Sequence, residues 1–182
     1  MKNILIIGIL IFTVVFANAQ ETEKKSKKEK KAEKKAQQIE TTKALIDNNN
    51  FTFYATSALP SQGRTVNLEY RYSVTIKNDT VDSYLPFYGR AYSVAYGGTD
   101  SGFDFTQPII DYSVEEKKKG YLVKVKTKNG NDNIQYTFNI SETGSASLSV
   151  TTTNRQSISY HGNIDPEEAV KKEKKKKDKE KK

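Results

Sequence analysis

One stretch of the chain alternates apolar and polar residues so regularly that it allows little besides a β-sheet with one wet face. Between Val66 and Lys77 every second residue is apolar or aromatic, and the residues between them are polar. Successive side chains of a strand point to opposite faces of the sheet, so this period of two predicts a long, half-buried strand. The turn-forming stretch 77–80 (KNDT) follows and predicts a hairpin with a partner strand from Val81.

The same alternation returns in shorter segments further along the chain. Apolar residues alternate with lysines after Tyr121, and Asn129-Gly130 is a turn signal before the returning strand that begins at Ile134. Further strands are expected around residues 51–55, 103–114, 146–150 and 158–160. About eight or more strands with short turns predict a mainly β (or α+β) fold. The expected sheet is a single antiparallel meander, arranged as a sandwich or as a partial or full barrel.

A helical pattern precedes the first strand. Residues 30–47 are rich in helix-forming residues, with Ala36, Ile39 and Ile46 near a spacing of three and four. The run of residues 47–50 (DNNN) then ends the pattern. We therefore expect one N-terminal helix, of which only the last two turns carry an apolar stripe that can dock on the β-domain.

The first residues of the chain have the three parts of a secretory signal peptide. Lys2 is followed by an apolar run of 13 residues, 4–16, and by the small-residue signal Ala17-Asn18-Ala19. A run of this length is too short to span a bilayer core. We therefore expect cleavage between Ala19 and Gln20, export of the chain, and no transmembrane segment in the mature protein.

The absence of cysteine narrows the location and the chemistry further. The sequence has no Cys, so it lacks the residue that carries the lipid of a bacterial lipoprotein. The mature protein is expected to be periplasmic or secreted, and its fold is held by packing without disulfides.

The net charge of +8 is concentrated at the two ends of the chain. Residues 1–35 hold nine Lys and four Glu, residues 165–182 hold nine Lys and six acids, and the middle is neutral. Such lysine blocks stay solvated, and in an exported protein they can contact anionic envelope surfaces, whereas nucleic acid is not an expected partner. The expected organisation is a signal peptide at 1–19, a Lys-rich disordered leader at 20–35, a β-rich domain at 36–164, and a Lys-rich, disordered or transiently helical tail at 165–182.

A tyrosine-rich stretch, 83–98 (SYLPFYGRAYSVAYGG), is the candidate site for a ligand or partner. In an extended chain, one face of it would be aromatic, and Tyr suits a half-wet groove because it has an apolar ring and a hydroxyl. The chemistry would be aromatic contact with an apolar or sugar-like ligand or an envelope protein, with Arg90 orienting an anionic group. The alternative is that the rings fill the core or cap a sheet edge, with Arg90 paired to an acid such as Asp82. The candidate contact residues are Tyr84, Pro86, Phe87, Tyr88, Arg90, Tyr92 and Tyr96.

The sequence offers little for catalysis. His161 is the only histidine, which excludes a histidine-cluster metal site, and it is expected to be a surface residue beside Gly162. The acids are scattered singly, so no catalytic residues, metal ligands or cofactors are expected, and the protein is interpreted as non-enzymatic. Two alternatives remain, namely a carrier of a lipid or other apolar ligand in a barrel-like cavity, and a hydrolase.

Three segments together resemble a known family. These are SYLPFYGRAYSVAYGG, GFDFTQPIIDYSV and GSASLSVTTTNRQSISYHGNI, in this order, within residues 39–164. They are similar to the signature blocks of the domain-of-unknown-function 4251 family, found in exported proteins of Bacteroidetes bacteria. The resemblance implies an exported, envelope-associated β-rich domain and no particular activity. Family members often carry a lipid-anchoring Cys after the signal, whereas this chain has Gln20 there.

Overall fold

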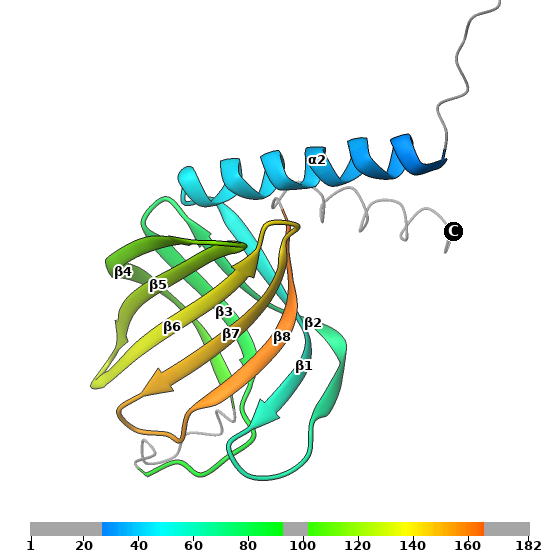
Figure 1. The fold of residues 1–182 in the computed structure, drawn as a ribbon. Helices are drawn as coiled ribbons and strands as arrows, with labels where there is room; N and C mark the ends of the chain where they lie inside the picture. Colours follow the sequence, from blue (N-terminus) through cyan, green and yellow to red (C-terminus); the bar gives the residue numbers. More distant parts are fainter. Residues whose placement is uncertain (1–26, 93–101, 166–182) are drawn as a thin grey trace, which may run out of the picture. The chain divides into compact units, whose positions relative to one another are not determined.

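The computed structural model describes residues 27–92 and 102–165, which form one helix and eight strands (Figure 1). No helix among these residues is long and apolar enough to cross a membrane. The elements are α2 (Lys27–Asp47), β1 (Phe51–Pro60), β2 (Val66–Lys77), β3 (Thr80–Pro86), β4 (Gly102–Lys117), β5 (Gly120–Asn129), β6 (Asp132–Ser141), β7 (Ser145–Thr152) and β8 (Ile158–Asp165).

The strands form a closed antiparallel barrel in sequence order. Each strand pairs with the next one along the chain, and β1 pairs with β8 to close the sheet. This confirms the mainly β fold and the antiparallel meander. Of the arrangements left open by the sequence, the structure shows the barrel, and the barrel is closed rather than partial.

Short turns set the register of the hairpins. Asn78 and Asp79 both have positive φ angles, 48° and 56°, as a two-residue turn of mirror-image type requires. Gly130 at the β5–β6 turn has a φ of 59°. Asn, Asp and Gly tolerate this region better than other residues, which is why these stretches were readable as turns in the sequence.

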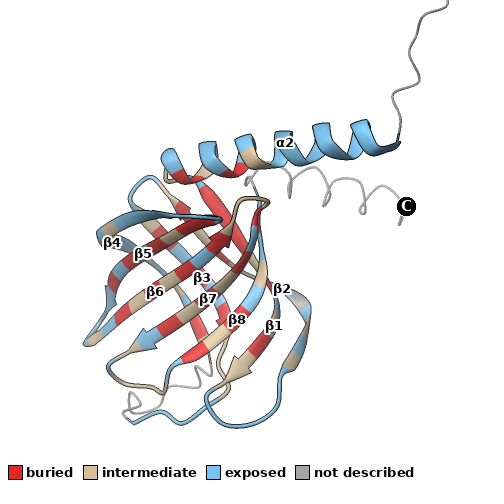
Figure 2. Ribbon diagram, viewed as in Figure 1, coloured by how far each residue is buried: buried red, intermediate tan, exposed pale blue. Residues whose placement is uncertain are grey.

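The inside of the barrel is filled by the apolar residues of the alternating pattern, seen as red bands in Figure 2. Phe138 lies at the centre of an aromatic group, with ring centroids 5.4 Å from Phe51, 5.8 Å from Phe53 and 6.4 Å from Tyr136. All four side chains are completely buried. Burying aromatic rings of this size is a large part of what stabilises a barrel without disulfides.

Gly162 allows β1 and β8 to come close at the seam that closes the barrel. A Cβ atom at this position would lie 1.8 Å from the backbone oxygen of Tyr54 and 3.1 Å from the ring of Phe53. The register of β1 also shifts here, between Ala55 and Ser57, in its pairing with both neighbours. The seam therefore depends on a residue without a side chain.

Helix α2 begins earlier than expected and ends where expected. It starts at Lys27, so residues 27–35, expected to lie in the disordered leader, are helical in the structure. At its end, the amide of Asn50 donates to the carbonyl of Leu45 (3.0 Å), and Asn49 has a φ of 49°, which is a left-handed helix cap. Only Thr42 and Ile46 are buried, and the Tyr112 hydroxyl donates to the Ile46 carbonyl (3.3 Å). The last turns therefore dock on the barrel, as the apolar stripe predicted.

Strand β4 is longer than its neighbour β3. A strand was expected around residues 103–114, and the structure has a single strand of 16 residues there. The ladder with β3 ends at the pair Thr80–Pro108, whereas the ladder with β5 continues to Lys117. A register shift between Ile109 and Asp111 in the ladder with β5 lies directly after the last residue of β4 that pairs with β3.

Candidate functional site

The tyrosine-rich segment starts in β3 and continues at the end of the barrel that lies away from Ile46. We call this the distal end, because the β1–β2, β5–β6 and β7–β8 connections lie there (Figure 1). Tyr84 is still in β3, is 49% exposed and stacks on Tyr72 with a centroid distance of 5.2 Å. After Pro86 the chain leaves the ladder, so the extended alternation expected for the whole segment stops there.

Residues 87–92 are held by the β7–β8 connection. Ala91 forms an isolated β-bridge with Arg155, and the amide of Tyr92 donates to the carbonyl of Asn154 (2.7 Å). Gln156 makes two hydrogen bonds to the backbone of Arg90. The backbone amide of Gln156 donates to the Arg90 carbonyl (3.0 Å), and the side-chain oxygen of Gln156 accepts from the backbone amide of Arg90 (3.1 Å). Nothing in the sequence indicates that these two distant segments meet.

The side chain of Arg155 contacts both the residues that follow β3 and the start of β4 at the distal end. Its guanidinium lies over the rings of Phe87 and Phe103, 5.4 Å and 5.2 Å from their centroids, and it donates to the carbonyl of Gly102 (2.9 Å). The two rings meet edge to face at 5.7 Å. Such a cation–π arrangement with a hydrogen bond holds the loop against the core.

The buried Tyr160 makes a second contact at the distal end, between β8 and the end of β3. Its hydroxyl donates to the Pro86 carbonyl (2.6 Å), and burial raises the pKa of this phenol well above its usual value. It therefore stays a neutral donor, which suits a structural bond to a backbone carbonyl.

The structure thus divides the predicted contact residues into two groups. Phe87 and Tyr88 are partly buried and pack against the core, as in the alternative interpretation of the segment. Tyr84, Arg90 and Tyr92 are exposed, Tyr92 by 68%. Pro86 is partly buried and accepts the bond from Tyr160 described above, and Tyr96 lies outside the described residues.

Arg90 does not use the acid suggested for it. The backbone amide and carbonyl of Arg90 are bound by Gln156, and Arg90 is exposed. The carboxylate of Asp82 instead accepts from the Thr106 hydroxyl (2.9 Å) on the neighbouring strand. Whether the exposed members of the segment contact a ligand stays a prediction.

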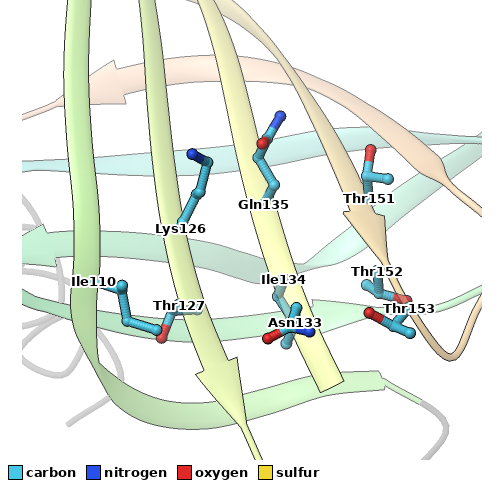
Figure 3. Close-up of a pocket in the computed structure, with 9 residues that line it drawn as sticks. All are labelled: Ile110, Lys126, Thr127, Asn133, Ile134, Gln135, Thr151, Thr152 and Thr153. Carbon is cyan, nitrogen blue, oxygen red and sulfur yellow. The ribbon is translucent and has the colours of Figure 1, made fainter. Parts of the chain in front are cut away.

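A groove that the sequence did not predict runs across four neighbouring strands, β4 to β7 (Figure 3). Its volume is about 410 Å³. Ile110, Lys126 and Thr151 are exposed, whereas Thr127 and Ile134 are buried and form its deeper part. The lining residues are Ile110, Lys126, Thr127, Asn133, Ile134, Gln135, Thr151, Thr152 and Thr153.

The register of the sheet explains how these residues come together. Asp111, Lys126, Gln135 and Thr151 lie in one row across the four strands, each directly opposite the next. Lys126 is neutralised by an ion pair with Asp111, with 2.8 Å between its Nζ and the carboxylate. The groove therefore offers hydroxyl and amide groups and the exposed side chain of Ile110, and its one lysine is already paired.

A local signal for the groove did exist in the sequence. Ile109 and Ile110 are adjacent apolar residues within a predicted strand, and such a break in the period of two is typical of a bulge. In the structure the register shifts at this point, and Ile110 lies on the surface with 67% of its area exposed. The exposed isoleucine forms one side of the groove (Figure 3).

The groove and the tyrosine-rich segment meet at the distal end. Asp132 accepts from the amides of Thr153 (2.9 Å) and Asn154 (3.1 Å), which fixes the loop that follows the groove-lining threonines. Asn154 in turn accepts from the amide of Tyr92. The backbone of the exposed Tyr92 is thus one residue away from the groove wall at Thr153.

His161 lies on β8, away from the groove. It is exposed, and its ladder neighbours are Ser57 on β1 and Ser147 on β7. In the part of the chain that the structure describes, no three His, Asp or Glu residues gather in a way that could hold a metal ion.

These features define a closed, eight-stranded antiparallel barrel with an N-terminal helix and a groove on its side. The chain belongs to the family described as domain of unknown function DUF4251, whose model matches residues 33–164, and this confirms the resemblance seen in the sequence. The fold is similar to the crystal structure of a DUF4251 family protein from Bacteroides eggerthii, with a TM-score of 0.55 and 13% identity over 72% of this chain and 89% of that chain. At that identity the likeness shows the fold alone. Among curated proteins, none matches the chain.

Proposed function

We propose that the protein is an exported, non-enzymatic binding protein of the bacterial envelope, and that its groove holds a neutral, hydroxyl-rich ligand such as a saccharide chain. The observation that carries this proposal is the lining of the groove, in which hydroxyl and amide side chains surround two isoleucines and a neutralised lysine. Concave sites with a few converging polar groups on an apolar floor are the usual form of a small-molecule site.

The chemistry of the lining matches a sugar better than an ion or a lipid. Threonine hydroxyls and the amides of Asn133 and Gln135 both donate and accept, as do sugar hydroxyls. Ile110, 67% exposed, supplies apolar surface for the C–H face of a sugar ring. Tyr92, whose amide is bound to the residue that follows Thr153, is the aromatic residue available to extend the contact to a longer chain.

The N-terminal residues of the chain support the proposed envelope location. The apolar run at 4–16 and the Ala19–Gln20 cleavage signal support export. The first turns of α2 are exposed and carry six lysines and two glutamates between residues 27 and 35. This positive charge favours contact with anionic envelope surfaces, in a manner that salt weakens.

The barrel interior, in which the carrier alternative would place a lipid, is already filled by side chains. Phe51, Phe53, Tyr136, Phe138 and Tyr160 are completely buried inside the barrel. A lipid chain in the barrel interior would have to displace some of these side chains. Lipid co-purifying with the protein in native mass spectrometry would support the carrier and contradict the saccharide proposal.

A binding experiment with a wall-type glycan tests the proposal. The mature chain, from Gln20, is titrated with the N-acetylglucosamine tetramer by calorimetry and by chemical-shift mapping. Removing one groove partner, in Gln135→Ala or Thr151→Val, is expected to weaken binding about three- to tenfold, because a neutral hydrogen bond contributes about 1 kcal/mol. Asn139→Ala is the matched control, since Asn139 is an exposed amide on the same strand and outside the groove.

Two results would contradict the saccharide proposal. The first is a tetramer that causes no shifts at residues of β5, β6 and β7. The second is binding that Gln135→Ala and Asn139→Ala weaken equally. Export is tested separately, by fractionation of cells and N-terminal sequencing of the mature protein, and a chain that stays in the cytoplasm with its first residues intact would contradict it.

A further inference from the structure

The end of β4, residues 110–117, forms one of the open edges of the barrel. It is hydrogen-bonded to β5 on one side, but β3 ends at the pair Thr80–Pro108 on the other. No strand within residues 27–92 and 102–165 pairs with that other side. Alternate residues of such an edge direct their amide and carbonyl groups away from the sheet, ready to pair with another strand. Figure 2 shows exposed residues along β4.

The edge also presents apolar side chains. Ile110 and Val114 are 67% and 43% exposed, and the other large, exposed hydrophobic residues of the described chain are Tyr84 and Tyr92 at the distal end. The Tyr112 hydroxyl is bound to the end of α2, on the face of the sheet that also carries Val114, and no strand of the described residues pairs with the edge itself. An open edge with exposed apolar residues is typical of a surface that pairs with another strand.

We propose that this edge pairs with the same edge of a second copy of the chain, in an antiparallel ladder with a two-fold axis at Val114. A two-fold axis perpendicular to the sheet makes each interface self-complementary. It also requires facing residues to belong to the same face of the sheet, so only every second register is available.

Among the registers centred on residues 113, 114 and 115, the charges of the segment favour one. With Val114 opposite itself, Asp111 faces Lys117 of the second copy at both ends of the ladder, and two valines meet at the centre. Moving the axis to Ser113 would place Asp111 opposite Glu115, and moving it to Glu115 would place two glutamates opposite each other. Like charges directly opposite each other are destabilising, whereas opposite charges and apolar pairs are favourable.

The inference needs no ligand in the groove, although Asp111 of the edge also pairs with the groove residue Lys126. It predicts a two-fold dimer in which the sheet of one barrel continues into the next through residues 111–117. The ladder is short and Lys117 also pairs with Glu115 within its own chain, so we expect a dimer that dissociates on dilution.

Analytical ultracentrifugation of the mature chain is the first test. We expect a monomer–dimer equilibrium that Val114→Lys and Lys117→Glu each weaken at least about tenfold, because they place two like charges opposite each other. Lys124→Glu is the matched control, since it makes the same charge change at an exposed position of β5 that is not on the edge. Each variant must keep the thermal midpoint of the parent.

Cysteine cross-linking locates the contact, and the absence of native Cys makes its result unambiguous. Facing residues of an antiparallel pair have Cα atoms about 4.5–5.5 Å apart, which is within disulfide range. Val114→Cys should therefore form a disulfide-linked dimer on mild oxidation, whereas Tyr92→Cys, at an exposed residue of the distal end, should not. A chain that stays monomeric at about 100 µM, or a dimer that Val114→Lys and Lys117→Glu leave intact, would overturn the proposal.

Discussion

Replacing Arg155 tests how much its side chain contributes to the stability of the distal end. Replacing Arg155 by Ala removes the hydrogen bond to the Gly102 carbonyl and the contact of the guanidinium with Phe87 and Phe103. It leaves the backbone bridge to Ala91 in place. The change therefore isolates the contribution of the side chain.

The size of the effect follows from the contacts. A hydrogen bond from a charged group contributes about 1.5–3 kcal/mol when buried, and this one is partly buried, so the lower end applies. A cation–π contact adds about 0.5–1 kcal/mol, counted once because one guanidinium serves both rings. The expected loss is about 2–3 kcal/mol. For a domain of this size, that corresponds to a fall of roughly 8–12 °C in the thermal midpoint.

Differential scanning calorimetry of the mature chain measures the loss. Arg155→Lys keeps the charge and loses the planar group that covers the rings, so its midpoint should lie between those of the parent and the alanine variant. Arg64→Ala is the control, because Arg64 is an exposed arginine in the β1–β2 connection at the same end. The reasoning fails if Arg155→Ala melts within about 1 °C of Arg64→Ala.

Three further predictions concern the seam, the core and alkaline pH. Gly162→Ala should lower the free energy of unfolding by at least about 3 kcal/mol in urea denaturation, because its Cβ would collide with the Tyr54 backbone. Gly130→Ala, in an open turn, should cost only about 1 kcal/mol, and equal losses for the two would contradict the seam argument. Phe138→Ala should cost about 3–5 kcal/mol by the same measurement, and a loss below about 1 kcal/mol would contradict its central place in the core. Burial raises the pKa of Tyr112 to about 12, so its contribution to stability is complete below about pH 10 and is lost as pH rises through 12. Midpoints measured between these pH values should fall less steeply for Tyr112→Phe, and identical slopes would refute this assignment.

Much of the fold could be predicted because its information is local. The alternation that ends at Val74 and Ile76 depends only on the period of a strand, and the turns at Asn78 and Gly130 depend only on residues that tolerate positive φ. Closure could not be predicted in this way. The pairing of β1 with β8 has no local signature, since it depends on the number, tilt and stagger of all eight strands.

The candidate site shows the same division. Tyr84 and Tyr92 could be named as exposed aromatic candidates, but the alternation after Pro86 predicted an extended chain with opposite faces. Instead the chain turns across the distal end, and the neighbours Phe87 and Tyr88 both pack against the core. Their burial depends on contacts with Phe103, Arg155 and Tyr160, which come from other parts of the chain, so it could not follow from the segment itself.

The closing seam also sets the order in which the barrel can form. Seven of the eight ladders join strands that are consecutive in the sequence, so they can form as hairpins soon after their residues are available. The ladder between β1 and β8 joins residues about 100 positions apart, as in the bond from the Thr56 hydroxyl to the His161 carbonyl. In a chain that emerges with its N-terminus first, β1 stays unpaired on that side until β8 has emerged. The period in which the open barrel can misassemble therefore ends only with the last strand, and truncation at β8 should prolong it.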